Sequence, residues 1–124
     1  MINNSNLKKL IQNQRPSITS SGNYSKMGFR DLKRLDTYVR GDVFSQDDCI
    51  RYTGELKKNT AIFSFKGRKV SLHRLLYHNY KNPIARTDII KFKCPNKGIC
   101  ANINHIYLKG DTPPQSESDE RENG

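Results

Sequence analysis

Three cysteines and one histidine constrain the fold of this chain more than any other feature of its sequence. Two of the cysteines and the histidine lie close together, as Cys94-x5-Cys100-x4-His105, and the third cysteine, Cys49, stands far upstream. Three thiols cannot all pair as disulfides within one chain. Three thiolates and one imidazole are a ligand set suited to tetrahedral Zn²⁺. The pattern therefore predicts one structural zinc per chain, bound by these four residues.

A second use of the same residues stays open. Cysteine is among the most buried residue types, so the three thiols could pack as small apolar side chains, with His105 as a hydrogen-bonded core residue. The size of the expected core, residues 49–110, favours zinc, because a structural zinc contributes on the order of 10–16 kcal/mol of apparent binding free energy to small domains. Four protein ligands leave no open coordination position, so we expect a structural metal and not a catalytic one.

The positive charge of the chain is concentrated in one stretch. The chain has 22 Lys and Arg against 12 Asp and Glu, a formal net charge of +10. Residues 49–114 contain 13 of these basic residues and three acids, so their excess equals that of the whole chain. A localised positive field is typical of proteins that bind a polyanion, because phosphate neutralisation releases counterions. A solvated, solubilising surface is the alternative.

Composition divides the chain into three parts. Residues 1–25 are rich in Asn and Ser with isolated apolar residues, and 113–124 form an acidic tail, so we expect both ends to be disordered. The hydrophobic content of the whole chain, 34%, agrees with such unfolded ends. Residues 26–112 are expected to form one zinc-binding domain, with a covering helix at 26–41 and a core at 49–110.

Periodicity predicts an α+β fold. Apolar residues at helical spacing predict a helix over 27–40, and Ser71 is expected to cap a second helix that ends near Tyr80. A short helix over 7–14 is an alternative within the N-terminal arm. Short segments rich in β-branched and aromatic residues predict a small antiparallel meander and a later pair of strands, at 49–53, 60–66, 69–71, 88–93 and 105–108.

The chain has no sequence signal for a membrane or for secretion. No apolar run approaches the ~18 residues that a bilayer span needs, and the N-terminus lacks a signal-peptide core. We therefore expect an intracellular protein that does not bind membranes. Asn, Lys and Ile make up 36 of the 124 residues, a composition typical of an AT-rich coding genome such as that of a large DNA virus or phage. The expected location is then the cytoplasm or nucleus of a host, or the virion.

Five short blocks of the chain resemble a known family. In chain order, the blocks are Cys49–Gly54, Ser71–Tyr77, Asn82–Ile84, Lys93–Cys94 and Cys100–Leu108. In order and spacing they are similar to the HNH or His-Me finger (ββα-metal) endonucleases, in particular the branch with a zinc-binding loop known from homing endonucleases and phage proteins. The resemblance covers residues 49–110. It implies a zinc-stapled His-Me finger fold in which the four residues named above are the zinc ligands.

Two positions depart from the pattern of that family. Its general-base histidine falls two residues before the first loop cysteine, where this chain has Phe92, which cannot accept a proton. Its metal-binding Asn falls at Pro114, beside Gln115, and no apolar face follows, so the terminal helix is expected to be truncated. Loss of the base and the metal ligand together should remove most of the hydrolytic rate. We therefore expect no catalytic residue in this chain.

Two further histidines are candidates to replace the missing base. His73 matches a structural position of the family, and a histidine on a helix that faces a sheet is more often a core residue than a base. It remains a weak catalytic candidate. His78 lies near the end of the expected helix, and we expect it to be solvated.

These observations lead to three hypotheses of function. The first is a domain that has lost the catalytic residues of the family and binds nucleic acid, with double-stranded DNA a better-supported ligand than RNA. Its basic side chains would contact phosphate. These candidate contacts are Arg51, Lys66, Arg68, Lys69, Arg74, Lys91, Lys93 and Lys97. The second is an active, divergent nicking endonuclease that would require Mg²⁺. The third is a zinc-stapled structural or adaptor protein whose basic face meets an acidic protein or a packaged genome. A homodimer is compatible with each hypothesis.

Overall fold

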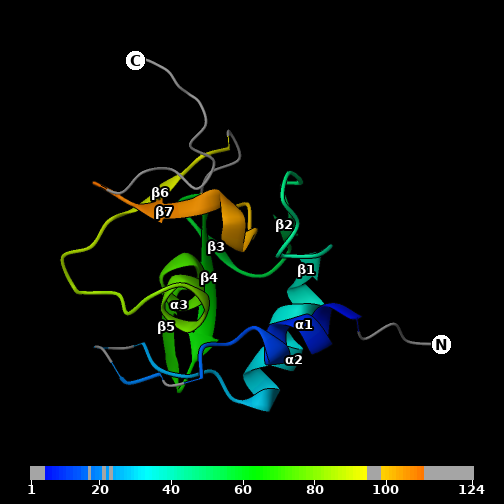
Figure 1. Ribbon diagram of the computed structural model, residues 1–124, viewed down its shortest axis with the longest axis horizontal. Helices are drawn as coiled ribbons and strands as arrows, with labels where there is room; N and C mark the ends of the chain where they lie inside the picture. The colour runs from blue at the N-terminus through cyan, green and yellow to red at the C-terminus, as the bar shows by residue number, and fades with distance from the viewer. Residues whose placement is uncertain (1–4, 17, 21, 23, 95–98, 111–124) are drawn as a thin grey trace.

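The structure, a computed structural model, describes residues 5–16, 18–20, 22, 24–94 and 99–110. Helices and small antiparallel sheets alternate along this part of the chain, so the expected α+β fold class is confirmed (Figure 1). The elements are α1 (Ser5–Gln12), α2 (Phe29–Tyr38), β1 (Val39–Arg40), β2 (Arg51–Tyr52), β3 (Leu56–Lys57), β4 (Thr60–Phe65), β5 (Arg68–Ser71), α3 (Leu72–Tyr80), β6 (Ile90–Phe92), the 3₁₀ turn η1 (Ile103–His105) and β7 (Ile106–Leu108).

The strands form three small antiparallel sheets. β3, β4 and β5 make a meander, with Phe63 of β4 opposite Val70 of β5. β6 pairs with β7, and β1 pairs with β2. The expected pairing of 60–66 with 69–71 is present as β4 and β5. The expected first strand of the meander, at 49–53, is wrong, because β2 pairs with β1 in a separate sheet and β3, which was not expected, takes its place beside β4.

The apolar core lies between α3 and the meander. Alternate residues of β4, among them Phe63 and Phe65, are buried, and β4 packs against α3 (Figure 1). On α3 the residues at helical spacing, Leu72, Leu75 and Leu76, are fully buried. Ser71 caps the helix as expected, since its hydroxyl accepts a hydrogen bond from the backbone N–H of Arg74.

The N-terminal segment differs from the expectation of a disordered arm. Residues 5–12 form α1, which packs against α2, and Leu7 and Leu10 on its inner face are buried. The segment after α1 is bound to the end of α3, where the guanidinium of Arg15 donates to the carbonyl of His78. Average composition did not show this, because two leucines at helical spacing and a few polar contacts are enough to fix the segment. The acidic tail lies outside the described residues.

His78 is buried and not solvated, contrary to the sequence-based expectation. Its Nε2 donates to the carbonyl of Thr19 at 2.7 Å, and its Nδ1 accepts from the backbone N–H of Ile84 at 3.1 Å. The N-terminal segment covers this end of α3, so the environment of His78 depends on residues distant in sequence. No helix among the described residues has the length and apolar character that a bilayer span requires.

Candidate metal centre

Backbone pairing brings the segment of Cys49 against the loop that contains Cys100. Arg51 and Cys100 form an antiparallel bridge, although they lie far apart in the sequence. On one side of this bridge the N–H of Ala101 donates to the carbonyl of Ile50 at 2.6 Å. On the other side the N–H of Tyr52 donates to the carbonyl of Ile99 at 3.1 Å. The pairing of these two segments therefore places Cys49 and Cys100 close together.

The hairpin of β6 and β7 brings Cys94 and His105 together. Phe92 stands opposite Ile106 in this hairpin, and the pairing continues for one more bond, from the N–H of Lys93 to the carbonyl of His105 at 2.9 Å. Cys94 follows directly after Lys93. The register of one hairpin thus fixes the positions of two candidate ligands.

The four side chains converge on one point. The Sγ atoms of Cys49, Cys94 and Cys100 and a ring nitrogen of His105 all lie within 4.8 Å of one another. The Nδ1 atom of His105 is 3.7 Å from the sulfur of Cys49 and 3.6 Å from that of Cys100. The four residues that the sequence singled out as metal ligands therefore lie close enough to hold one metal ion.

The electrostatics of the cluster suit a cation. Cys100 is buried, and burial raises the pKa of its thiol, so a nearby positive charge is needed to stabilise the thiolate. Burial, followed by the positive charge of Lys93, lowers the pKa of His105 and keeps its imidazole neutral, which is the form that binds metals. The N–H of Ile50 points at the sulfur of Cys100 at 3.4 Å, as donors to metal-bound thiolates do.

Two asparagines hold the segment that precedes Cys49. The side-chain amide of Asn102 donates to the carbonyls of Ser45 and Asp48, at 2.8 and 2.6 Å, and that of Asn104 donates to the carbonyl of Phe44 at 2.8 Å. Sequence reasoning missed this role. The signal was present in the run between Cys100 and His105, where two amides alternate with apolar residues, but the partners could not be read from it.

Phe92 stands at the position where the resemblance would put a catalytic base, and it contacts His73. Their rings meet edge to face, with centroids 4.7 Å apart and an interplanar angle of 87°. His73 is buried, its Nε2 donates to the carbonyl of Cys100 at 2.7 Å, and burial lowers its pKa to about 4. His73 is thus a hydrogen-bonded core residue. Pro114 and Gln115 lie outside the described residues.

The basic residues singled out for nucleic-acid contact do not form a single surface. Lys66, Arg68 and Lys69 are exposed at the turn between β4 and β5, at the end of the molecule away from the β6–β7 hairpin (Figure 1). Arg51 and Lys91 are exposed near the metal end. Lys93 and Arg74 are only half-exposed, and Lys97 lies outside the described residues.

Among the candidates that the structure describes, Lys69 and Arg74 form ion pairs or hydrogen bonds within the chain. Lys69 pairs with Glu55, with an N–O distance of 2.9 Å. Arg74 donates to the carbonyls of Ala85 and Asp88, so its guanidinium fixes the turn before β6. Both residues are therefore weaker candidates for phosphate contact than the sequence suggested.

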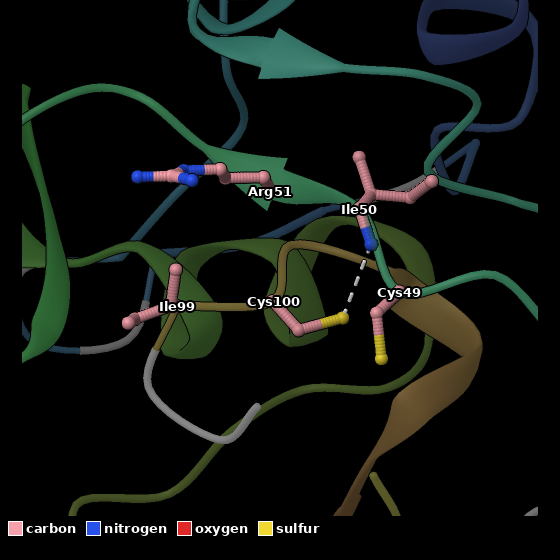
Figure 2. Close-up of a pocket in the computed structure, with 5 residues that line it drawn as sticks. All are labelled: Cys49, Ile50, Arg51, Ile99 and Cys100. Atoms are coloured by element: carbon pink, nitrogen blue, oxygen red, sulfur yellow. Dashed lines mark hydrogen bonds between the residues drawn. The ribbon is translucent and has the colours of Figure 1, made fainter. Parts of the chain in front are cut away.

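A cavity of about 330 Å³ lies beside the cluster. Figure 2 shows five described residues that line it. They are Cys49, Ile50, Arg51, Ile99 and Cys100. Two candidate ligands thus form part of a cavity wall.

Comparison with known proteins finds a viral relative. No family model matches the chain, and no solved structure matches it. An uncharacterized protein of Acanthamoeba polyphaga mimivirus is 35% identical to the chain over 126 residues. The match covers 93% of the chain and 36% of the viral protein, so the chain spans little more than a third of that relative. A viral relative agrees with the viral source that the composition of the chain led us to expect.

Proposed function

We propose that the chain is a zinc-stabilised domain that binds nucleic acid, and that its preferred ligand is double-stranded DNA. The domain derives from an HNH endonuclease and has lost the nuclease centre. The observation that carries the proposal is the convergence of three cysteines and a histidine from separate segments on one point. The resemblance of the surrounding sequence blocks to zinc-binding HNH proteins connects this centre with nucleic acid.

The proposed zinc acts as a structural crosslink. Cys49 precedes β2, Cys94 follows β6, and Cys100 and His105 flank the loop that leads into β7. The pairs β1–β2 and β6–β7 are two-stranded, and such pairs are marginally stable in water on their own. A tetrahedral Zn²⁺ with four protein ligands would join both pairs to each other and leave no position open for substrate.

The turn between β4 and β5 is the proposed phosphate contact. Lys66 and Arg68 are exposed there, and the turn lies at the far end of the molecule from the hairpin of the metal centre (Figure 1). At the metal end, the negative charges of Asp47 and Asp48 act on His105 and partly oppose the burial and the Lys93 charge that together lower its pKa. Contact of the two basic side chains at the turn with phosphate would release counterions and favour binding.

The non-catalytic part of the proposal rests on Phe92 and His73. An aromatic ring stands where the family has its base, and the nearest imidazole is buried, bonded to a carbonyl and shifted to a pKa of about 4. A base with so low a pKa is weak at neutral pH. These features favour binding over a divergent nicking activity.

Fluorescence anisotropy with labelled duplexes tests the proposal. The zinc-loaded chain should bind duplex DNA of any sequence, and the logarithm of the binding constant should fall linearly with the logarithm of salt concentration. Double-stranded RNA and polyglutamate are the comparison ligands. Failure to bind DNA at low salt, or tighter binding to polyglutamate than to DNA, would favour the adaptor hypothesis instead.

A further inference from the structure

The cavity beside the metal centre gives solvent a path to two of the candidate ligands. Cys49 and Cys100 both line it, and Figure 2 shows their sulfurs close to each other, with the side chain of Arg51 extending away from them. Cys49 is exposed, whereas Cys94 is half-buried and Cys100 is buried. A small solute that enters the cavity therefore meets Cys49 first.

We propose that Cys49 and Cys100 form a peroxide-sensitive thiol pair, which oxidises to a disulfide and thereby releases the metal. The inference rests on the zinc site proposed above and adds a chemical reaction to it. The pair is distinguished from the other two cysteine pairs by the cavity, because Cys94 is not among the residues that line it.

The backbone holds the two cysteines ready to react. Arg51 and Cys100 are bridge partners, and the N–H of Ile50 donates to the sulfur of Cys100 at 3.4 Å. The sulfurs lie within 4.8 Å of each other, and a disulfide bond is about 2.05 Å long. Formation of the disulfide therefore requires movement of the two side chains, which stand on segments that already pair at Arg51.

The reaction needs a peroxide as the oxidant. The Cys49 thiolate attacks one peroxide oxygen, the O–O bond breaks, hydroxide leaves, and Cys49 becomes a sulfenic acid. The Cys100 thiolate then attacks the sulfur of Cys49, and a second hydroxide leaves as the disulfide forms. With hydrogen peroxide, the two thiolates lose two electrons, and two protons convert the hydroxides to two waters.

Disulfide formation would remove half of the ligand set. Only Cys94 and His105, both on the β6–β7 hairpin, would remain for the metal. The thiolate and not the disulfide sulfur is the metal ligand, so two ligands would hold Zn²⁺ far more weakly than four. Reduction of the disulfide restores both thiolates, so the release is reversible.

Peroxide treatment of the zinc-loaded protein tests this inference. A chromogenic zinc chelator should report one zinc released per chain, and peptide mapping without reduction should show a disulfide between Cys49 and Cys100. Dithiothreitol and fresh zinc should restore the original metal content. A disulfide to Cys94, or sulfinic acid without any disulfide, would overturn the assignment of the pair.

A variant that fills the cavity tests the route of entry. Ile99→Trp places a large side chain in the cavity wall and keeps all four ligands, and it should slow zinc release on the order of tenfold, because access limits thiol reactivity. Ile11→Trp adds the same side chain at an exposed position on α1 and should release zinc at the rate of the unmodified protein. If the tryptophan at position 99 prevents zinc binding, Ile99→Phe takes its place. Equal release rates at both positions would refute entry through the cavity.

Metal analysis before oxidation separates this inference from the proposed function. If the chain binds no zinc after purification and zinc addition, the zinc-stabilised domain of the proposed function is itself wrong. A chain that binds one zinc, and then keeps both the zinc and three titratable thiols in peroxide, refutes the thiol switch alone.

Discussion

His73 and Cys100 are joined by a hydrogen bond in which the Nε2 of His73 donates to the carbonyl oxygen of Cys100 at 2.7 Å. Both residues are buried, and His73 belongs to the helix that packs on the meander. Burial lowers the pKa of His73 to about 4, so the ring is neutral near physiological pH and no buried charge opposes the contact. This hydrogen bond connects the apolar core to the metal loop. A change in the position of the metal loop should therefore alter the environment of α3.

The first prediction separates His105, a candidate ligand, from His78, one of the two buried histidines of α3. His105→Gln should abolish zinc binding, because it removes the ligand whose Nδ1 lies near two sulfurs. His78→Gln should keep one zinc per chain but lower the free energy of unfolding by about 1–3 kcal/mol, because buried hydrogen-bond partners lose their bonds. Metal analysis and denaturant unfolding of both variants check this.

The matched experiment is chelation of the unmodified protein. Removal of the proposed zinc should abolish cooperative unfolding, because the metal contributes much of the stability of so small a domain. A metal-free preparation with an unchanged melting curve would contradict the structural role of the metal.

The second prediction concerns α1. Leu10 is fully buried and its neighbour Ile11 is exposed, so the two positions form a matched pair on one helix. Leu10→Ala should lower the free energy of unfolding by about 2–5 kcal/mol, since it leaves a cavity in the core. Ile11→Ala should change it by less than about 0.5 kcal/mol, as surface substitutions do. Equal, small effects at both positions would mean that the N-terminal segment is not part of the folded domain.

Local patterns in the sequence were sufficient for the main elements. The helical spacing of Leu72, Leu75 and Leu76 and the alternation of β4 predicted the two surfaces that pack together, because each pattern reports which side of an element is apolar. The ligand types and their spacing likewise indicated a metal site before any geometry was known.

Contacts between distant segments could not be predicted in the same way. His78 is bonded to the carbonyl of Thr19, in the segment that covers it. The residue before Cys49 is held by the side-chain amide of Asn102, which lies far along the chain. No local pattern records such pairings. The sequence likewise could not predict that the basic residues lie at two ends of the molecule, because neighbouring charges in a sequence can point to different faces of the fold.

The third prediction locates the nucleic-acid interface. Lys66→Glu with Arg68→Glu should weaken binding to all duplexes alike, and it should make the salt dependence of log K shallower by about 0.9 for each phosphate that the variant no longer neutralises. Arg51→Glu with Lys91→Glu changes the net charge by the same amount at the metal end. This control should weaken binding less. Equal effects of the two pairs would show that overall charge, and not the turn between β4 and β5, governs binding in anisotropy titrations.

The fourth prediction concerns catalysis. The unmodified protein should show no Mg²⁺- or Mn²⁺-dependent nicking of supercoiled DNA above background, because Phe92 cannot act as a base and His73 is buried and bonded to a carbonyl. Robust nicking that is lost in a His73→Gln variant with intact zinc content would establish the divergent nuclease hypothesis instead.

Adding the two groups that HNH endonucleases have at positions 92 and 114 should confer little activity. Phe92→His with Pro114→Asn supplies a base and a metal ligand, and a positioned base alone contributes typically 10²–10⁴-fold. The imidazole at position 92 would stand against the ring of His73, which lies 4.7 Å from the present phenyl ring, and the asparagine at position 114 would lack the family's terminal helix to hold it in place. A catalytic group misplaced by about 1 Å can lose on the order of 10²-fold, so we expect at most partial activity over the single variants in a nicking assay. Cleavage as efficient as that of an intact HNH enzyme would show that only the two side chains, and not the scaffold that positions them, separate this chain from an active nuclease.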